Sequence, residues 1–106
     1  MEELKAKELV VKAGLDLIEN GLIARTWGNV SCRVDENFFV ITPSGRSYES
    51  LTPADIVRCS VVDASYTGDI KPSSERGIHA LMYREHADAN FVIHTHQLQA
   101  SAVSVL

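Results

Sequence analysis

The chain has 106 residues, of which 45% are hydrophobic and 23% charged, and its formal net charge is −4. A chain of this length forms one domain at most, and its acidic balance without a lysine or arginine cluster argues against a nucleic-acid or membrane partner. Because there is neither a basic leader followed by an apolar stretch nor an apolar run of about 18 residues, we expect a cytoplasmic location.

The first predicted element is an amphipathic helix over residues 3–19, in which apolar residues recur at helical spacing. Asn20-Gly21 supplies a stop in the left-handed region. Segments 30–34 and 38–42 then flank the short polar connection 35–37, which is typical of a β-hairpin. These elements predict a helix that packs on an antiparallel sheet.

The middle of the chain contains a turn-rich segment and a short helical turn, for which Thr52 is the N-cap and Pro53 the first residue. A strand is expected over 57–63. Cys32 and Cys59 have no CxxC partner, so we expect buried reduced thiols.

The second half of the chain predicts a helix capped by Ser73 or Ser74 that runs to about His86, with Ile78, Leu81 and Met82 as its apolar face. A buried strand follows at 91–95. Residues 97–106 are expected to form a helix without a stop signal, so the chain is expected to end inside an element. Together the elements predict an α/β fold, with a mainly antiparallel central sheet flanked by helices.

The pair His94 and His96 stands at the end of the last predicted strand. Residues i and i+2 share one face of a strand, so the two imidazoles can converge on one metal ion. If this strand runs antiparallel to the preceding helix, it returns beside the first turn of that helix, where Glu75 supplies a third candidate ligand. Glu75 could instead pair with His79, although His79 is more simply a histidine at the edge of the core.

Three loops rich in small and hydroxyl residues accompany this candidate metal site. Each is first of all a turn signal, but together they can present backbone and side-chain donors to a phosphate. The candidate donors are Asn29, Ser44, Gly45, Ser73 and Ser74.

Four short motifs occur in one order along the chain: GNVS at 28–31, TPSG at 42–45, SSE at 73–75 and HTH at 94–96. In these motifs and their spacing the chain resembles the class II aldolase/adducin superfamily. Its enzymes include L-fuculose-phosphate aldolase and L-ribulose-5-phosphate 4-epimerase. The resemblance extends over residues 1–106 but covers only the N-terminal half of the usual domain of the family.

The resemblance implies that Glu75, His94 and His96 hold a divalent metal, usually zinc, and that Glu75 is also the catalytic acid/base group. It implies a homo-oligomer, typically a homotetramer, and a third histidine ligand beyond the present chain, which leaves this chain incomplete for turnover. The pocket for the substrate phosphate is implied to consist of Thr26, Asn29, Ser44, Gly45, Ser73 and Ser74.

The function implied by the resemblance is reversible retro-aldol cleavage of a sugar phosphate similar to L-fuculose 1-phosphate, through a metal-stabilised enediolate. Two alternatives stay open. One is a sugar-phosphate epimerase or dehydratase of the same fold. The other is a non-catalytic interaction domain similar to the adducin head.

Overall fold

A computed structural model describes residues 1–21, 28–94 and 101–103 of the chain. Its helices and strands follow one another along the chain as α1 (Glu3–Glu19), β1 (Asn29–Arg33), β2 (Phe38–Ile41), η1 (Tyr48–Ser50), η2 (Pro53–Asp55), β3 (Val57–Ser60), α2 (Arg76–Glu85), β4 (Phe91–His94) and β5 (Ser101–Val103), where η marks a 3₁₀ helix. None of the helices in these ranges is long and apolar enough to cross a membrane.

The strands form a five-stranded sheet in the order β3-β2-β1-β4-β5, and every neighbouring pair is antiparallel. The predicted hairpin is confirmed, because β1 pairs with β2 across the connection 35–37. Asp35 shapes this turn, since its Oδ1 accepts hydrogen bonds from the backbone N–H groups of Asn37 and Phe38. Because β1 pairs with β2 on one side and with β4 on the other, it lies at the centre of the sheet.

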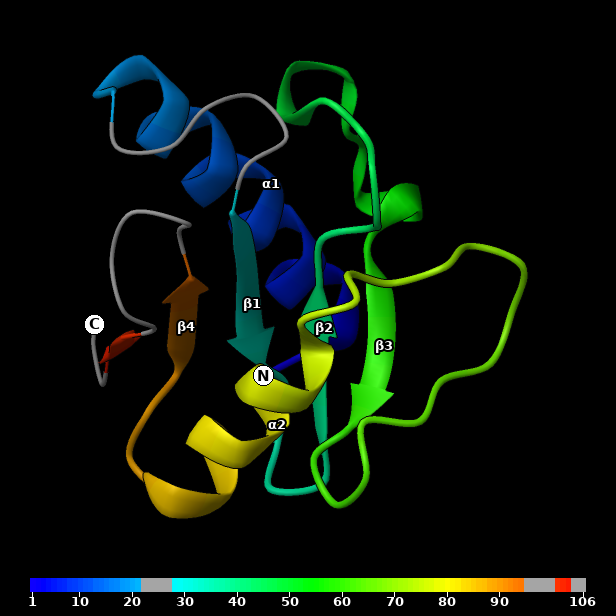
Figure 1. Cartoon of the computed structure of the whole chain (residues 1–106), viewed down its shortest axis with the longest axis vertical. Helices are drawn as coiled ribbons and strands as arrows, with labels where there is room; N and C mark the ends of the chain where they lie inside the picture. Colours follow the sequence, from blue (N-terminus) through cyan, green and yellow to red (C-terminus); the bar gives the residue numbers. More distant parts are fainter. Residues whose placement is uncertain (22–27, 95–100, 104–106) are drawn as a thin grey trace.

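The two long helices lie on opposite faces of the sheet, with α2 in front and α1 behind in Figure 1. Each face has its own apolar core. The α1 face is formed by Ala6, Val10, Val30, Cys32, Val40, Tyr48, Leu51 and Ile56. The α2 face is formed by Phe39, Ile41, Val57, Cys59, Val61, Ala64, Ala80, Tyr83, Ala89 and Val92. The expected α/β architecture, a mainly antiparallel sheet flanked by helices, is thus confirmed.

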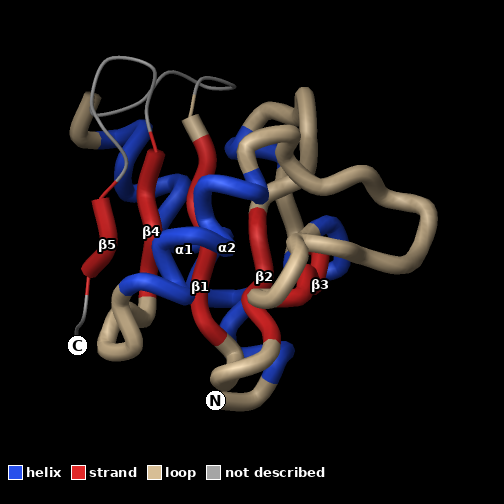
Figure 2. Tube along the Cα trace, turned by 60° about the horizontal axis from the view of Figure 1, so that its bottom comes forward, coloured by secondary structure: helices blue, strands red, loops and turns tan. Residues whose placement is uncertain are grey.

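The predicted helix over residues 97–106 is wrong where the structure describes it. Ser101–Val103 is strand β5, which pairs with β4 at the edge of the sheet, as the tube in Figure 2 shows. The short sequence Ser-Ala-Val suits a strand once β4 offers free backbone partners, so tertiary pairing decides its conformation. The remainder of the predicted helix lies outside the described residues.

Two further expectations need correction. α2 begins at Arg76, after the predicted caps Ser73 and Ser74, and Glu75 takes the N-cap position. The predicted apolar face of α2 is wrong for Ile78 and Leu81, which are 37% and 46% exposed, whereas the third predicted residue, Met82, is partly buried and packs against the core. The helix instead directs Ala80 and Tyr83 into the core, together with a buried histidine that belongs to the site described below.

The two cysteines behave as predicted. Cys32 and Cys59 are free thiols, one in each apolar core. Burial raises the pKa of each thiol to about 11, so both stay protonated and chemically quiet at neutral pH.

Candidate active site

A polar cleft of about 150 Å³ opens where β1 begins. Three segments far apart in the sequence meet there: the start of β1, the loop after β2, and the loop that leads into α2. The cleft is lined by Gly28, Asn29, Pro43, Ser44, Gly45, Arg46, Tyr48, Ser73, Ser74 and Glu75. It therefore gathers every candidate phosphate-binding residue named above except Thr26, which lies outside the described residues.

Backbone pairing between the two loops builds this cleft. Pro43 and Pro72 form an antiparallel bridge, the Ser44 N–H donates to the Lys71 carbonyl at 2.9 Å, and the Ser73 N–H donates to the Thr42 carbonyl at 3.0 Å. This short ladder fixes the TPSG segment beside the SSE segment. Ser44 of the first segment and Ser73 and Ser74 of the second therefore line the same cleft, although about 30 residues separate the two segments in sequence.

Gly45 illustrates why the TPSG loop uses small residues. Its φ is +70°, a left-handed conformation that glycine adopts without steric strain. No atom lies within 4 Å of the position of an added Cβ, so the backbone rather than packing requires glycine. Ser44 and Gly45 are both exposed, which leaves their donors accessible to a ligand in the cleft.

The loop before α2 contributes one buried and one exposed serine. Ser73 is 7% exposed, and its hydroxyl oxygen accepts a hydrogen bond from the Glu75 N–H at 3.1 Å. This bond orders the turn that precedes α2, so Ser73 helps to start the helix although it is not the N-cap. Ser74 is exposed and lines the cleft.

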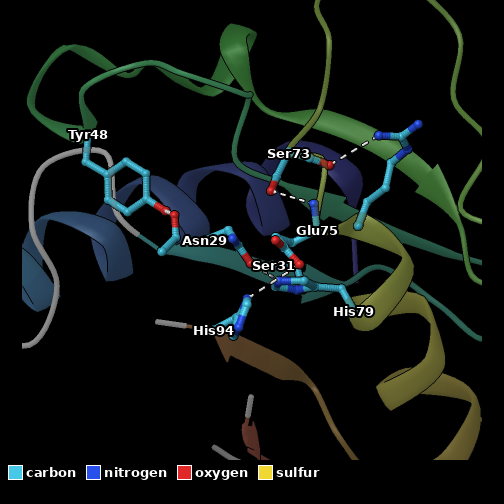
Figure 3. Close-up of polar contacts among 9 residues, drawn as sticks. Asn29, Ser31, Tyr48, Ser73, Glu75, His79 and His94 are labelled. Carbon is cyan, nitrogen blue, oxygen red and sulfur yellow. Dashed lines mark hydrogen bonds and ion pairs between the residues drawn. The ribbon is translucent and has the colours of Figure 1, made fainter. Parts of the chain in front are cut away.

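Glu75 and His94 meet at one side of the cleft. The Glu75 Oε2 lies 4.0 Å from the His94 Nδ1, and this nitrogen atom is buried. Their side chains approach each other from the start of α2 and the end of β4, as Figure 3 shows. The antiparallel return of the strand beside the helix start, predicted from element lengths, is confirmed for this pair.

The donor set of this pair fits a divalent metal. Carboxylate oxygen and imidazole nitrogen are both zinc ligands, and two ligands at about 2.0–2.2 Å from one ion lie within roughly 4 Å of each other. The third expected ligand, His96, lies outside the described residues. Within residues 1–21, 28–94 and 101–103, no group of three His, Cys, Asp or Glu side chains is placed to hold an ion.

A buried polar chain lies directly beneath the cleft. The His79 Nε2 is hydrogen-bonded to the Asn29 Oδ1, and its Nδ1 lies 2.6 Å from the Ser31 hydroxyl oxygen. That oxygen lies 2.7 Å from the Tyr83 hydroxyl. All four residues are at most 4% exposed. His79 therefore lies inside the core and not at its edge. Its ring is hydrogen-bonded to Asn29 and Ser31, and not to the Glu75 carboxylate.

Burial sets the protonation states of His79 and Tyr83 in this hydrogen-bonded chain. Desolvation, with a smaller contribution from the nearby His94, lowers the pKa of His79 to about 3. Desolvation also raises the pKa of the Tyr83 hydroxyl well above its usual value. Both groups are consequently neutral across the physiological range.

Sequence reasoning did not identify Ser31, His79 and Tyr83 as parts of the site. A signal was present in the spacing: Asn29 and Ser31 are i and i+2 on a strand, and His79 and Tyr83 are i and i+4 on a helix. Each spacing places two polar side chains on one face. Recognising the site required knowing that these two faces are opposed.

Comparison with known proteins gives a consistent result. Residues 8–106 match the family described as Class II Aldolase and Adducin N-terminal domain. A probable L-ribulose-5-phosphate 4-epimerase of Mycoplasma pneumoniae is 42% identical over 101 residues, which cover 91% of this chain and 40% of that protein.

Solved structures agree in fold. An L-fuculose 1-phosphate aldolase superimposes with a TM-score of 0.77 at 31% identity, over 87% of this chain and 44% of that chain. An L-fuculose-1-phosphate aldolase of Thermus thermophilus gives a TM-score of 0.70 at 31% identity, over 87% and 47% of the two chains. The present chain therefore spans less than half the length of each of these three proteins.

Proposed function

Because the chain belongs to the Class II Aldolase and Adducin N-terminal domain family, we propose that residues 1–106 form the N-terminal part of an enzyme domain that acts on a phosphorylated sugar with a divalent metal. The same proposal includes a cytoplasmic location and a homo-oligomer. Sedimentation of the purified chain across concentrations tests the assembly.

One observation carries the proposal: Glu75 lines the polar cleft and also lies 4.0 Å from His94. The residues that can bind a phosphate and the residues that can bind a metal are thereby adjacent. A sugar phosphate requires both the phosphate-binding and the metal-binding residues, because its anionic end must be held while its reacting carbonyl and hydroxyl groups are polarised.

The cleft residues bind and orient the substrate in this proposal. The hydroxyl groups of Ser44, Ser73 and Ser74, the Gly45 N–H and the Asn29 amide donate hydrogen bonds to phosphate oxygens, with Thr26 as a further donor. Backbone and hydroxyl donors suit this task because they recognise an anion without requiring a fixed positive charge.

Glu75, His94 and His96 would hold the metal, usually zinc in this family. Once bound, the ion would supply Lewis-acid polarisation of the substrate oxygens and stabilise developing negative charge. The Glu75 carboxylate serves as the acid/base group, since its oxygen can take up or release a proton at the substrate held in the cleft.

The reaction we propose first is retro-aldol cleavage of a sugar phosphate similar to L-fuculose 1-phosphate, supported by two aldolase structures that are 31% identical to this chain. Epimerisation is the second candidate, favoured by the 42% identical relative with an epimerase name. Cleavage products from L-fuculose 1-phosphate would support a lyase, and conversion of L-ribulose 5-phosphate into its 4-epimer would support the epimerase.

Zinc retention tests the metal half of the proposal. We expect the wild-type chain to keep a stoichiometric amount of zinc after exchange into metal-free buffer, and we expect Glu75→Gln and a His94→Ala, His96→Ala double variant to lose it. His86→Ala is the matched control, because His86 is an exposed histidine at the other end of α2.

Two outcomes would count against this metal site. Zinc retained by the double variant would place the metal elsewhere. A wild-type chain that keeps no zinc would mean that this chain alone holds no stable site, so the enzyme would depend on the third histidine ligand implied beyond it or give way to an interaction domain similar to the adducin head. The circular dichroism spectrum of each variant shows whether a loss of zinc reflects the ligands or the fold.

A further inference from the structure

The buried chain Tyr83–Ser31–His79–Asn29 runs from the core to the wall of the cleft. It begins at the Tyr83 hydroxyl on α2, crosses to Ser31 on β1, returns to the His79 ring and ends at the Asn29 amide. Figure 3 shows the last three of these residues. Asn29 is its only member that also lines the cleft. The first three residues thus act on a ligand only through Asn29.

The donor and acceptor at each link follow from the chemistry of the groups. The Asn29 Oδ1 can only accept, so the His79 Nε2 must carry the proton and donate. A neutral imidazole has one N–H, so its Nδ1 accepts from the Ser31 hydroxyl, and Ser31 in turn accepts from Tyr83. Every hydrogen bond in the chain therefore points in the same direction, from Tyr83 toward Asn29.

This direction fixes which arm of the Asn29 amide is available. With Oδ1 held by His79, the planar amide presents its NH₂ group on the other arm, turned away from the imidazole ring (Figure 3). A flipped amide would require the other tautomer of His79, with the proton on Nδ1 and Ser31 as its acceptor, and it would turn the carbonyl oxygen instead of the NH₂ group away from the ring.

We propose that His79 is a positioning residue: by donating from Nε2 to Asn29, it holds the Asn29 amide with its NH₂ group as a hydrogen-bond donor for an anion in the cleft. This inference rests on the proposed function, because it assumes that the cleft binds a phosphate. His79 itself does not touch the ligand.

The burial of His79 supports its assignment as a neutral ring with a single N–H donor. His79 is fully buried, and desolvation lowers its pKa to about 3, so the ring stays neutral and keeps a single N–H at physiological pH. Ser31 and Tyr83 are equally shielded from water, so no solvent molecule competes for the links that set the tautomer.

A matched pair of substitutions separates positioning from packing. In His79→Gln the side-chain amide reaches the position of Nε2 and can still donate to Asn29. In His79→Asn the shorter amide reaches only the position of Nδ1, so it keeps a partner for Ser31 and loses the donor to Asn29. Both variants replace the ring by an amide, and urea unfolding measures the stability cost of each.

The probe is inorganic phosphate, followed by amide chemical shifts in ¹H–¹⁵N spectra of the 106-residue chain. We expect His79→Gln to bind phosphate within about twofold of the wild type and His79→Asn to bind at least about tenfold more weakly, as for a lost hydrogen bond to a charged ligand. Equal affinity of His79→Asn and the wild type would overturn the positioning role.

A second readout does not depend on the ligand. A long-range ¹H–¹⁵N spectrum of the wild type reports which ring nitrogen of His79 is protonated, and we expect protonation at Nε2 alone at pH 7. Protonation at Nδ1 would overturn the inference even if phosphate binds. A wild-type chain that binds no phosphate but shows the Nε2 tautomer would instead overturn the proposed phosphate cleft, and with it the task assigned to His79.

Discussion

The two faces of the central strand β1 have different buried neighbours. Val30 and Cys32 belong to the apolar core beneath α1. Asn29 and Ser31 belong to the other face, where the imidazole of His79 and the hydroxyl of Tyr83 complete a buried polar chain. The twofold periodicity of one strand therefore separates an apolar support from a polar site.

This difference has an energetic consequence. A buried apolar core loses stability gradually when methyl groups are removed, because the neighbouring side chains relax in part. A buried hydrogen-bonded chain contributes modestly when complete but is costly when one member is lost, since the remaining groups stay desolvated without partners. A substitution on the face that carries the site should thus cost more stability than a similar substitution on the apolar face.

The largest predicted effect comes from His79→Leu. Leucine fills similar space but leaves the Asn29 Oδ1 and the Ser31 hydroxyl without their partner, so we expect a loss of roughly 2–6 kcal/mol in the free energy of unfolding, about 1–3 for each group. Ile56→Val on the α1 face, where Ile56 is 2% exposed, is the control and should cost about 1 kcal/mol. Urea unfolding of both variants measures the two losses in free energy. Equal losses would contradict the prediction that the polar face is the more sensitive to substitution.

The next effect is the pH dependence of stability. The folded-state pKa of His79 is about 3, below its unfolded value of about 6.5. Between these values the unfolded chain binds the extra proton, so the stability due to neutral His79 is complete above about pH 6.5 and is lost as the pH falls toward 3. One such group contributes up to about 1.4 kcal/mol per pH unit.

Unfolding of the wild type and His79→Gln at pH 7, 6 and 5 measures this contribution. The variant should lose less stability between pH 7 and 5 than the wild type does, by up to about 2 kcal/mol. His86→Gln removes an exposed histidine and should keep the wild-type slope. A wild-type slope in His79→Gln would show that His79 is not the group responsible.

Much of the α1 face could be predicted from the sequence because its signals are local. The helical spacing in residues 3–19 and the polar connection at 35–37 specify α1 and the β1–β2 hairpin without reference to distant residues. The approach of Glu75 to His94 was also predictable, since a helix and a returning strand of similar length bring their far ends together.

The polar face was less predictable because its contacts are long-range and two of the three residues assigned to the buried side of its helix are exposed. Ile78 and Leu81 suggested one buried face for α2, whereas the structure buries His79, Ala80 and Tyr83. Hydrophobicity alone misleads here, because the buried side of the helix carries a histidine whose hydrogen bonds offset its desolvation. Strand β5 was missed for a related reason, since its partner β4 stabilises it only in the folded chain.

The smallest predicted effects compare two tyrosines, one from each face. The Tyr48 hydroxyl donates to the Gly28 carbonyl at 2.7 Å, at the edge of the cleft, whereas Tyr83 donates to Ser31 beneath it. Tyr83→Phe removes the hydrogen bond to Ser31, and Tyr48→Phe removes the bond to Gly28 together with a longer one to the Thr42 hydroxyl at 3.4 Å. Each substitution should cost about 1 kcal/mol of stability.

The two substitutions should differ in their effect on the affinity for inorganic phosphate. Tyr48→Phe releases the residue that precedes Asn29 and should weaken binding by about fivefold, the equivalent of about 1 kcal/mol. Tyr83→Phe leaves Ser31 free to donate to His79, so the Asn29 amide keeps its orientation and binding should change by less than about twofold. If Tyr83→Phe weakened phosphate binding more than Tyr48→Phe, the orientation of Asn29 would depend on the whole buried chain rather than on the His79 N–H alone.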